Sequence, residues 1–205
     1  MDVYLFPLVN VTLFPKTTKP LNVFEPKYLE MVRHAVAHRV PLALAYVEEP
    51  SVLNAEATVG QRPASVREIA GYGIPQILEE RANGTMLIFV TGEGKCRLGP
   101  VKATQTPYLV CEAEPITEDL SVDLSLHPKI QALNRILARW ITTHIPDESQ
   151  RELFLKNLSG PEEIVGAFGA YLVRDYDLQQ MVLEFNSLNE KIEFLYRLAE
   201  SNETT

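Results

Sequence analysis

Two proline-flanked segments open the chain, Tyr4-Leu-Phe-Pro-Leu-Val-Asn-Val-Thr-Leu-Phe-Pro15 and Pro20-Leu-Asn-Val-Phe-Glu-Pro-Lys-Tyr-Leu-Glu-Met-Val32. Short runs of β-branched and aromatic residues are typical of strands, and proline suits the first position of a helix. The strands expected here cover residues 3–6, 9–13 and 21–24. A helix is expected from Pro26 to about Ala37, because apolar residues follow Pro26 at helical spacing.

Strand signals continue to residue 114, and glycine and proline punctuate them. The further strands expected cover residues 40–47, 74–80, 85–90, 95–98 and 108–114. Asn83-Gly84 falls between two of these strands. The pair predicts a tight hairpin with a type I′ turn, in which both central residues adopt positive φ.

The character of the chain changes near residue 117. Residues 1–117 hold 11 of the 14 prolines and 7 of the 10 glycines, whereas residues 118–205 contain long stretches with apolar residues at helical spacing. The helices expected there cover residues 127–144 and 148–158, with further starts at Ser159, Asp177 and Ser187. The sequence therefore predicts an α+β protein with a β-rich subdomain over 1–117 and a helical subdomain over 118–205.

Charge and cysteine usage limit the partners and the compartment. The chain has 19 basic and 27 acidic residues, a net charge of −8, which excludes nucleic-acid binding through bulk charge. A local patch is the other route, and its nearest basic candidates are scattered: Lys16, Lys19, Lys27 and Arg33. No apolar run reaches the roughly 18 residues of a membrane span. Cys96 and Cys111 form no CxxC pair, which favours reduced thiols and a cytoplasmic location.

A glycine-rich run, Gly92-Glu-Gly-Lys-Cys96, resembles the end of a phosphate-binding loop. However, cysteine stands where the magnesium-binding Ser or Thr belongs, and Phe89 occupies the place of the upstream glycine. We expect these glycines to shape a turn between strands, where positive φ or a close backbone contact is required.

Two other patterns could carry chemistry. Glu30, His34 and His38 are four residues apart, so one helix face could present all three to a divalent cation. The simpler interpretation is a solvated face with a contact between Glu30 and His34. Cys96 is the better candidate for a reactive thiol because it has basic neighbours, although burial in a strand would raise its pKa. We expect no catalytic residue, metal or cofactor; an enzyme built on one of these two patterns is kept as an alternative.

Both opening segments resemble the N-terminal LON domain of the Lon protease family, which carries a "PLFPL…VLFPG…LPLHIFEPRYREMV" pattern. Further similar segments are Gly71-Tyr-Gly73, Asn83-Gly-Thr85, Gly92-Glu-Gly-Lys-Cys-Arg97 and the run from Leu183 to Leu195. Lys16 and Lys191 depart from the family, in which glycine and arginine are usual at these places. The resemblance spans nearly the whole chain.

The resemblance implies a PUA-like pseudo-barrel with one helix, followed by a helical bundle. It also implies a non-catalytic substrate-binding or adaptor module that recognises polypeptides, without the ATPase and protease domains of Lon itself. The implied partners are unfolded or partner polypeptides, not a membrane, and self-association is a further option. The alternative is a PUA-like module that binds a small molecule or RNA.

The family motif residues in this chain are Phe14, Pro15, Phe24, Glu25, Pro26, Tyr28, Gly92 and Arg97. We expect them to be structural. Phe14, together with Phe6 and Leu13, would fill the barrel core, and Pro15 would stiffen a turn.

The motif also spans the start of the expected helix. Phe24, Pro26 and Tyr28 would fasten the preceding strand to that helix. The carboxylate of Glu25 would cap the helix, and Arg97 would either pair with Glu25 or face solvent. Binding itself is expected at an apolar groove or an exposed strand edge of the β part, because both tolerate many sequences.

Overall fold

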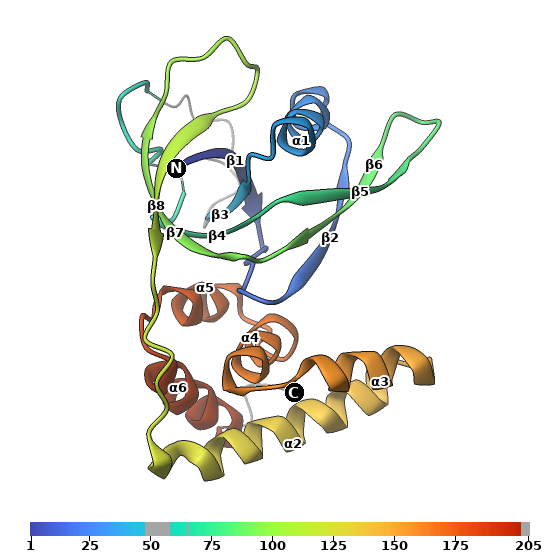
Figure 1. The fold of residues 1–205 in the computed structure, drawn as a ribbon, viewed down its shortest axis with the longest axis vertical. Coiled ribbons are helices and arrows are strands. Elements are labelled where there is room, and N and C mark those ends of the chain that lie inside the picture. Colours follow the sequence, from blue (N-terminus) through green and yellow to red (C-terminus); the bar gives the residue numbers. More distant parts are fainter. Residues whose placement is uncertain (48–57, 65, 202–205) are drawn as a thin grey trace. The chain divides into compact units, whose positions relative to one another are not determined.

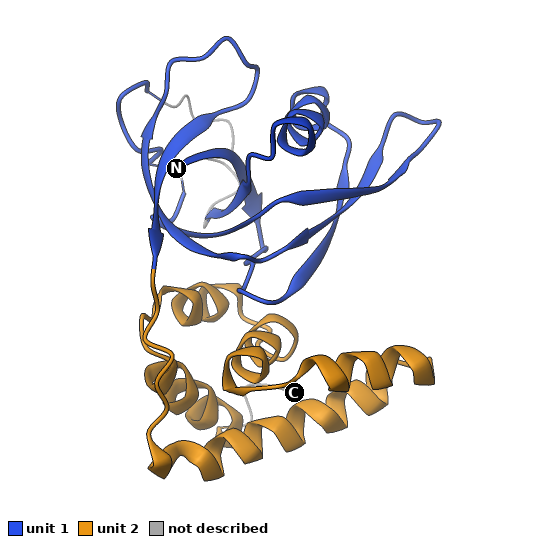
Figure 2. Ribbon diagram, viewed as in Figure 1, with its two compact units in different colours: residues 1–116 blue, residues 117–205 orange. Residues whose placement is uncertain are grey.

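The first part of the chain consists mainly of strands with one helix, and the second part of helices (Figure 1), which confirms the fold class expected from the sequence. The computed structural model describes residues 1–47, 58–64 and 66–201. The chain divides into two compact units, Met1–Ile116 and Thr117–Thr205 (Figure 2). We call them the β unit and the helical unit.

The β unit combines a closed barrel with a smaller sheet. Its described elements are β1 Asp2–Val9, β2 Thr18–Val23, α1 Pro26–His38, β3 Leu42–Val47, β4 Ile69–Gly73, β5 Pro75–Glu80, β6 Met86–Thr91, β7 Gly94–Val101 and β8 Val110–Ile116. β1, β3, β4, β7 and β8 form the barrel, and β2, β6 and β5 form a three-stranded sheet in that order. β1 and β3 are parallel, so the chain needs a crossover between them, and α1 lies within this connection.

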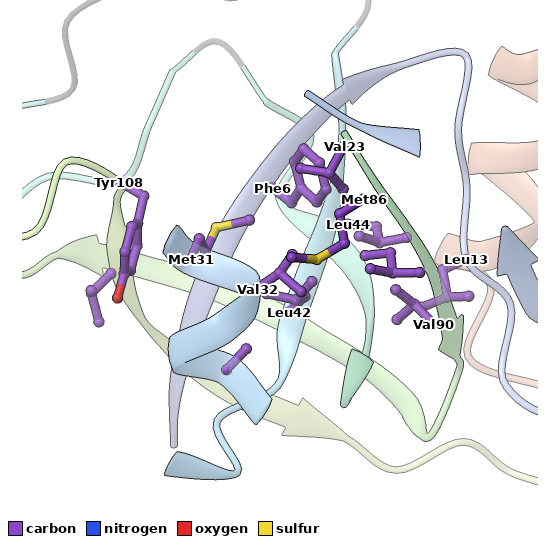
Figure 3. Close-up of a cluster of buried hydrophobic side chains, with 13 residues drawn as sticks. Phe6, Leu13, Val23, Met31, Val32, Leu42, Leu44, Met86, Val90 and Tyr108 are labelled. Carbon is purple, nitrogen blue, oxygen red and sulfur yellow. The ribbon is translucent and has the colours of Figure 1, made fainter. Parts of the chain in front are cut away.

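Two buried clusters stabilise the β unit, and β3 separates them. Ala43 and Ala45 belong to one cluster and Leu42 and Leu44 to the other, because successive residues of a strand point to opposite faces. β3 is therefore buried along its whole length. Figure 3 shows the second cluster, where Met31 and Val32 of α1 meet Leu42 and Leu44 of β3.

The strand expected over residues 9–13 is wrong. β1 runs unbroken from Asp2 to Val9, and the next residue, Asn10, adopts a φ of 60°. Leu13 and Phe14 are buried outside any strand. Leu13 and Phe6 belong to the cluster that includes residues of α1, β2 and β6, whereas all five barrel strands contribute to the other cluster, so their expected place in the barrel core is wrong. The backbone of Phe14 can pass this close to residue 92 only because residue 92 is glycine. A Cβ on Gly92 would lie 2.2 Å from the carbonyl oxygen of Phe14. The close backbone contact expected at Gly92 is thus confirmed.

The β5–β6 hairpin forms, but its type I′ turn is wrong. Only Gly84 of the Asn83-Gly84 pair adopts positive φ, at 81°. The N–H of Gly84 donates to the carbonyl of Arg81, and the N–H of Arg81 donates to the carbonyl of Thr85. This pattern is a three-residue loop that ends in a left-handed glycine. The side chain of Asn83 accepts a hydrogen bond from the N–H of Thr85 at 3.1 Å, which holds the loop in this form.

The helical unit begins with a short 3-10 turn and continues with five helices in its described residues. They are η2 Leu124–Leu126, α2 His127–His144, α3 Glu148–Asn157, α4 Pro161–Tyr171, α5 Tyr176–Glu184 and α6 Leu188–Glu200. α2 has the predicted bounds and packs against α4 and α6. In the part of the chain that is described, no helix combines the length and hydropathy needed to span a bilayer.

The predicted helix starts are shifted or lack the expected caps. Gly160, not Ser159, is the N-cap of α4, because Pro161 occupies the first helical position. Asp175 caps α5 through hydrogen bonds from the N–H groups of Asp177 and Leu178, so Asp177 lies inside the helix. Ser187 is the N-cap residue of α6, but its side chain makes no capping hydrogen bond.

A buried ion pair joins α6 to the segment before η2. The Lys191 Nζ lies 2.6 Å from a carboxylate oxygen of Glu118. A parallel β-bridge between Asp119 and Ser187 runs beside it. These contacts attach the start of the helical unit to its last described helix, 73 residues later in the chain.

Candidate functional site

A groove of about 300 Å³ lies in the β unit between the second half of β1, the end of β2 and the start of α1. It is lined by residues 6–9, residues 22–25, Lys27 and Tyr28. The structure therefore brings three of the motif residues, Phe24, Glu25 and Tyr28, to one place. We call this site the β-unit groove.

The floor of the β-unit groove is aromatic. The ring of Phe6 is buried and lies 4.6 Å from the ring of Tyr28, centroid to centroid, at an angle of 37°. Burial raises the pKa of the Tyr28 hydroxyl above its ordinary value, and Lys27 partly opposes this rise. Tyr28 therefore offers the groove a neutral hydroxyl at physiological pH.

Phe24 is 68% exposed beside this floor. The prediction that it fastens the strand to the helix is therefore wrong. Val23, the preceding residue and the last of β2, has the buried position instead. An exposed aromatic ring at a groove is available for contact with an apolar partner.

Glu25 occupies the N-cap position of α1, but its carboxylate does not cap the helix. Its backbone carbonyl accepts hydrogen bonds from the N–H groups of Tyr28 and Leu29, and its side chain forms an ion pair with Lys27 at 3.4 Å. Arg97 pairs with Glu68 at 2.6 Å, so a pairing of Arg97 with Glu25 is wrong too. The rim thus carries one acid beside one base.

Two strand edges border the β-unit groove. β8 pairs with β1 only over residues 2–4, whereas β3 pairs with residues 4–9 on the other side. The N–H of Tyr4 donates to Pro41, just before β3, and the N–H of Leu5 donates to Leu109, just before β8. By alternation, the main chain of Pro7 and Val9 points away from β3.

β2 supplies the second edge. It is the terminal strand of its sheet, and β6 is its strand neighbour in the described part of the chain. Pro20 fits this position, because proline cannot donate a ladder hydrogen bond and is confined to edges. The groove therefore lies where the second half of β1 meets the end of the terminal strand β2, with the aromatic rings of Phe6 and Tyr28 in its lining.

Pro15 lies in a turn, as predicted, and its neighbour Lys16 stands where the family usually has glycine. The N–H of Thr17 donates to the carbonyl of Phe14, which closes a turn with Pro15 second. Lys16 adopts a φ of 63° there. Such a conformation favours glycine, which the family motif usually has at this place.

Both cysteines are free thiols and buried. Burial raises the pKa of Cys96 to about 12 and that of Cys111 to about 11. A thiol with such a pKa is almost entirely protonated at neutral pH, which argues against a nucleophilic Cys96.

The candidate metal ligands on α1 make other contacts. The Nδ1 of His34 lies 2.7 Å from the Tyr108 hydroxyl and 3.9 Å from the Glu30 carboxylate. The Nδ1 of His38 lies 3.0 Å from the backbone carbonyl of His34. The Glu30–His34 contact expected on a solvated face is confirmed, and no group of three possible ligands gathers among the described residues.

Comparison with known families decides what kind of domain this is. The model of the ATP-dependent protease La (LON) substrate-binding domain matches residues 2–201. The chain belongs to this family. The LON resemblance read from the opening segments is thus confirmed, and the domain that matches is a substrate-binding one. The comparison with curated proteins finds no match.

Two solved structures share the LON fold with this chain. The Lon N-terminal domain protein from Xanthomonas campestris is 16% identical, with a TM-score of 0.68, and the match covers 96% of this chain and 98% of that one. The N-terminal domain of the Mycobacterium avium complex Lon protease is 14% identical, with a TM-score of 0.71, and the match covers 98% and 100%. At this identity the likeness shows the fold.

Sequence reasoning missed half of the β-unit groove of this LON domain. Pro7, Leu8 and Val9 line it, together with Asn22 and Val23. The signal that could have found them is the pair of prolines, Pro7 and Pro20, since proline within a strand pattern marks an edge. Which two edges face one groove depends on the topology.

Proposed function

We propose that this protein is a non-catalytic module that binds extended polypeptide segments in the β-unit groove. The observation that carries the proposal is the open main chain of β1 and β2 beside an apolar floor. An extended peptide added to a strand edge gains affinity from main-chain hydrogen bonds, and pockets between the edges select its side chains. Binding of this kind suits a substrate filter, because unfolded chains share a backbone and not a sequence.

The proposal assigns recognition to the subdomain 1–117 and specific roles to three motif residues. Phe24 covers an apolar side chain of the bound segment, and Tyr28 forms the floor below it. Glu25 and Lys27 form a rim without net charge, which agrees with a peptide better than with the phosphates of RNA. A cytoplasmic location, and action as a substrate-binding or adaptor protein beside a separate protease, belong to the same proposal.

A binding titration with a permanently unfolded protein tests this function. Reduced and carboxymethylated α-lactalbumin is the probe, and native α-lactalbumin is its folded control. We expect the unfolded form alone to bind, and Phe24→Ala to weaken binding about tenfold, because one exposed aromatic anchor is lost. Salt-steep binding of single-stranded RNA, or equal affinity for both forms of the probe, would contradict the proposal.

A second pair of variants tests the strand edge itself. Val9→Pro removes the N–H that points away from β3, while Tyr4, Phe6 and Leu8 keep the bonds to β3. We expect binding about three- to tenfold weaker, as for the loss of one hydrogen bond. The matched control is Val9→Ala, which shortens the side chain but retains the N–H, and it should bind like the parent.

A further inference from the structure

The helical unit has a larger groove of its own, of about 690 Å³, between η2, α5 and α6. Its floor is apolar and contains Leu126, Leu178, Phe185, Phe194 and Leu198. The rings of Phe185 and Phe194 are half-buried and meet edge to face at 5.5 Å. We call this site the helical groove. Its size lies within the usual range of ligand sites.

The charges at the rim of the helical groove are separated along α6. Glu190 lies in the first turn of α6 and Arg197 in the last. Asp123 joins the acidic end, because its N–H donates to the side chain of Asn189 at 3.2 Å. Seven residues of helix separate Glu190 from Arg197, about 10 Å along the axis.

A third acid, Glu193, lies midway along the rim but is already neutralised by Lys129 at 2.5 Å. Among the described residues, Asp123, Glu190 and Arg197 form no ion pair. The helical groove therefore presents a negative end and a positive end on either side of an apolar floor.

We propose that the helical groove binds an amphipathic helix of a partner protein, antiparallel to α6, with acidic residues in its first turn and basic residues in its last. The direction follows from electrostatics. A helix is stabilised by acids near its N-terminus and bases near its C-terminus, and α6 follows this rule itself. Two helices that both follow it have complementary ends only when they run antiparallel.

The apolar floor of the helical groove further specifies the side chains of the partner helix. Apolar side chains at i, i+3, i+4 and i+7 form the stripe that such a groove accepts. The acid and the base lie about two turns apart on the flank of this stripe, opposite Arg197 and Glu190. The excess of acid at the rim favours a partner whose basic end carries more than one lysine or arginine.

Two synthetic peptides of identical composition test the proposal on the full chain. Both are 16-residue helices with leucines at this spacing; one has glutamates in the first turn and lysines in the last, and the other has them exchanged. Binding is followed by fluorescence anisotropy of the labelled peptide. We expect the first peptide to bind about three- to tenfold more tightly at low salt, and the preference to shrink as salt is added.

A charge-swapped protein provides the decisive control. Glu190→Lys with Arg197→Glu should invert the preference for the two peptides, while circular dichroism reports that the fold is kept. Leu178→Ala, on the floor, should weaken both peptides alike. Phe24→Ala, in the other unit, should leave both affinities unchanged. The test of the helical groove is therefore independent of the test of peptide binding in the β-unit groove.

Three outcomes would overturn the proposal. One is equal binding of both peptides by the parent protein, and another is a preference that the charge-swapped protein retains. The third is a concentration-dependent dimer in sedimentation that Leu178→Ala dissociates, since a second copy of the chain would then be the occupant.

Discussion

The β unit and the helical unit each contain an ion pair whose charged atoms lie 2.6 Å apart, Arg97–Glu68 in the first and Lys191–Glu118 in the second. Their surroundings are opposite. The side chains of Arg97 and Glu68 are 50% and 46% exposed, whereas those of Lys191 and Glu118 are 4% and 10% exposed. The comparison shows that separation alone does not set the energetic role of an ion pair.

Exposure to solvent gives the two ion pairs different energetic roles. Water and salt screen the exposed pair, and each of its charges is well solvated when the partner is removed. The buried pair has exchanged water for mutual attraction, so either charge left alone would lie in an environment that cannot solvate it. The first pair should therefore contribute little to stability, whereas loss of one charge of the second pair should destabilise the helical unit strongly.

The largest expected effect comes from breaking the buried pair on one side. Lys191→Met should lower the free energy of unfolding by about 3–5 kcal/mol, because the Glu118 carboxylate stays buried without its ammonium partner. Urea unfolding followed by far-ultraviolet circular dichroism measures the change. Lys191→Arg keeps the charge that the family usually carries there and serves as the matched control.

Removing both charges sharpens the same comparison. Lys191→Met combined with Glu118→Leu should recover most of that loss, because an apolar pair needs no compensation for lost hydration. A double-mutant cycle with the two single variants gives the coupling free energy. A double variant as unstable as Lys191→Met would show that the residues act through packing and not through their charges.

Cys96 extends the comparison to a single ionisable group in the β unit. Its pKa is raised to about 12 by burial, while the unfolded chain releases the proton near the ordinary value of 9.0. The folded state thus favours the neutral thiol. The resulting contribution to the free energy of unfolding is complete below pH 9 and is lost as pH rises toward 12. At pH 10 the loss is about 1.4 kcal/mol.

Measured stability between pH 8 and pH 10 tests this expectation. Other groups titrate in the same range, so the relevant quantity is the difference between the parent and Cys96→Ala, which cannot ionise there. We expect the parent to lose about 1.4 kcal/mol more than the variant by pH 10. Parallel pH profiles for the two proteins would mean that the Cys96 thiol ionises as readily in the folded as in the unfolded chain.

Much of the fold could be predicted because it depends on local patterns. The helix that begins at Pro26 and the one over residues 127–144 follow from apolar spacing and proline placement. β4 is harder to predict, because Gly71 and Gly73 interrupt its apolar pattern. Both glycines are needed there, since a Cβ at either position would collide with a neighbouring backbone. The turn at Asn83 was misread because its side chain stabilises a different loop with the same two residues.

The candidate site depends on contacts that local patterns do not contain. β2 pairs with β6 up to Val23, just before the exposed Phe24, and the partner of Arg97 lies 29 residues away in the chain. Lys191 and Glu118 are 73 residues apart, so nothing near either residue indicates a buried pair. Sequence reasoning located the motif correctly, but only the topology shows which of its side chains reach solvent.

The smallest effect is expected at the exposed pair, and it completes the comparison. Arg97→Ala should lower the free energy of unfolding by less than about 1 kcal/mol, because the Glu68 carboxylate is hydrated once its partner is gone. The effect should shrink further in 0.5 M salt, where screening weakens exposed pairs, whereas the deficit of Lys191→Met should persist. Unfolding curves of both variants at low and high salt make this measurement. Equal salt dependence for the two would show that burial does not separate these pairs, and the contrast between the two units would then have no electrostatic basis.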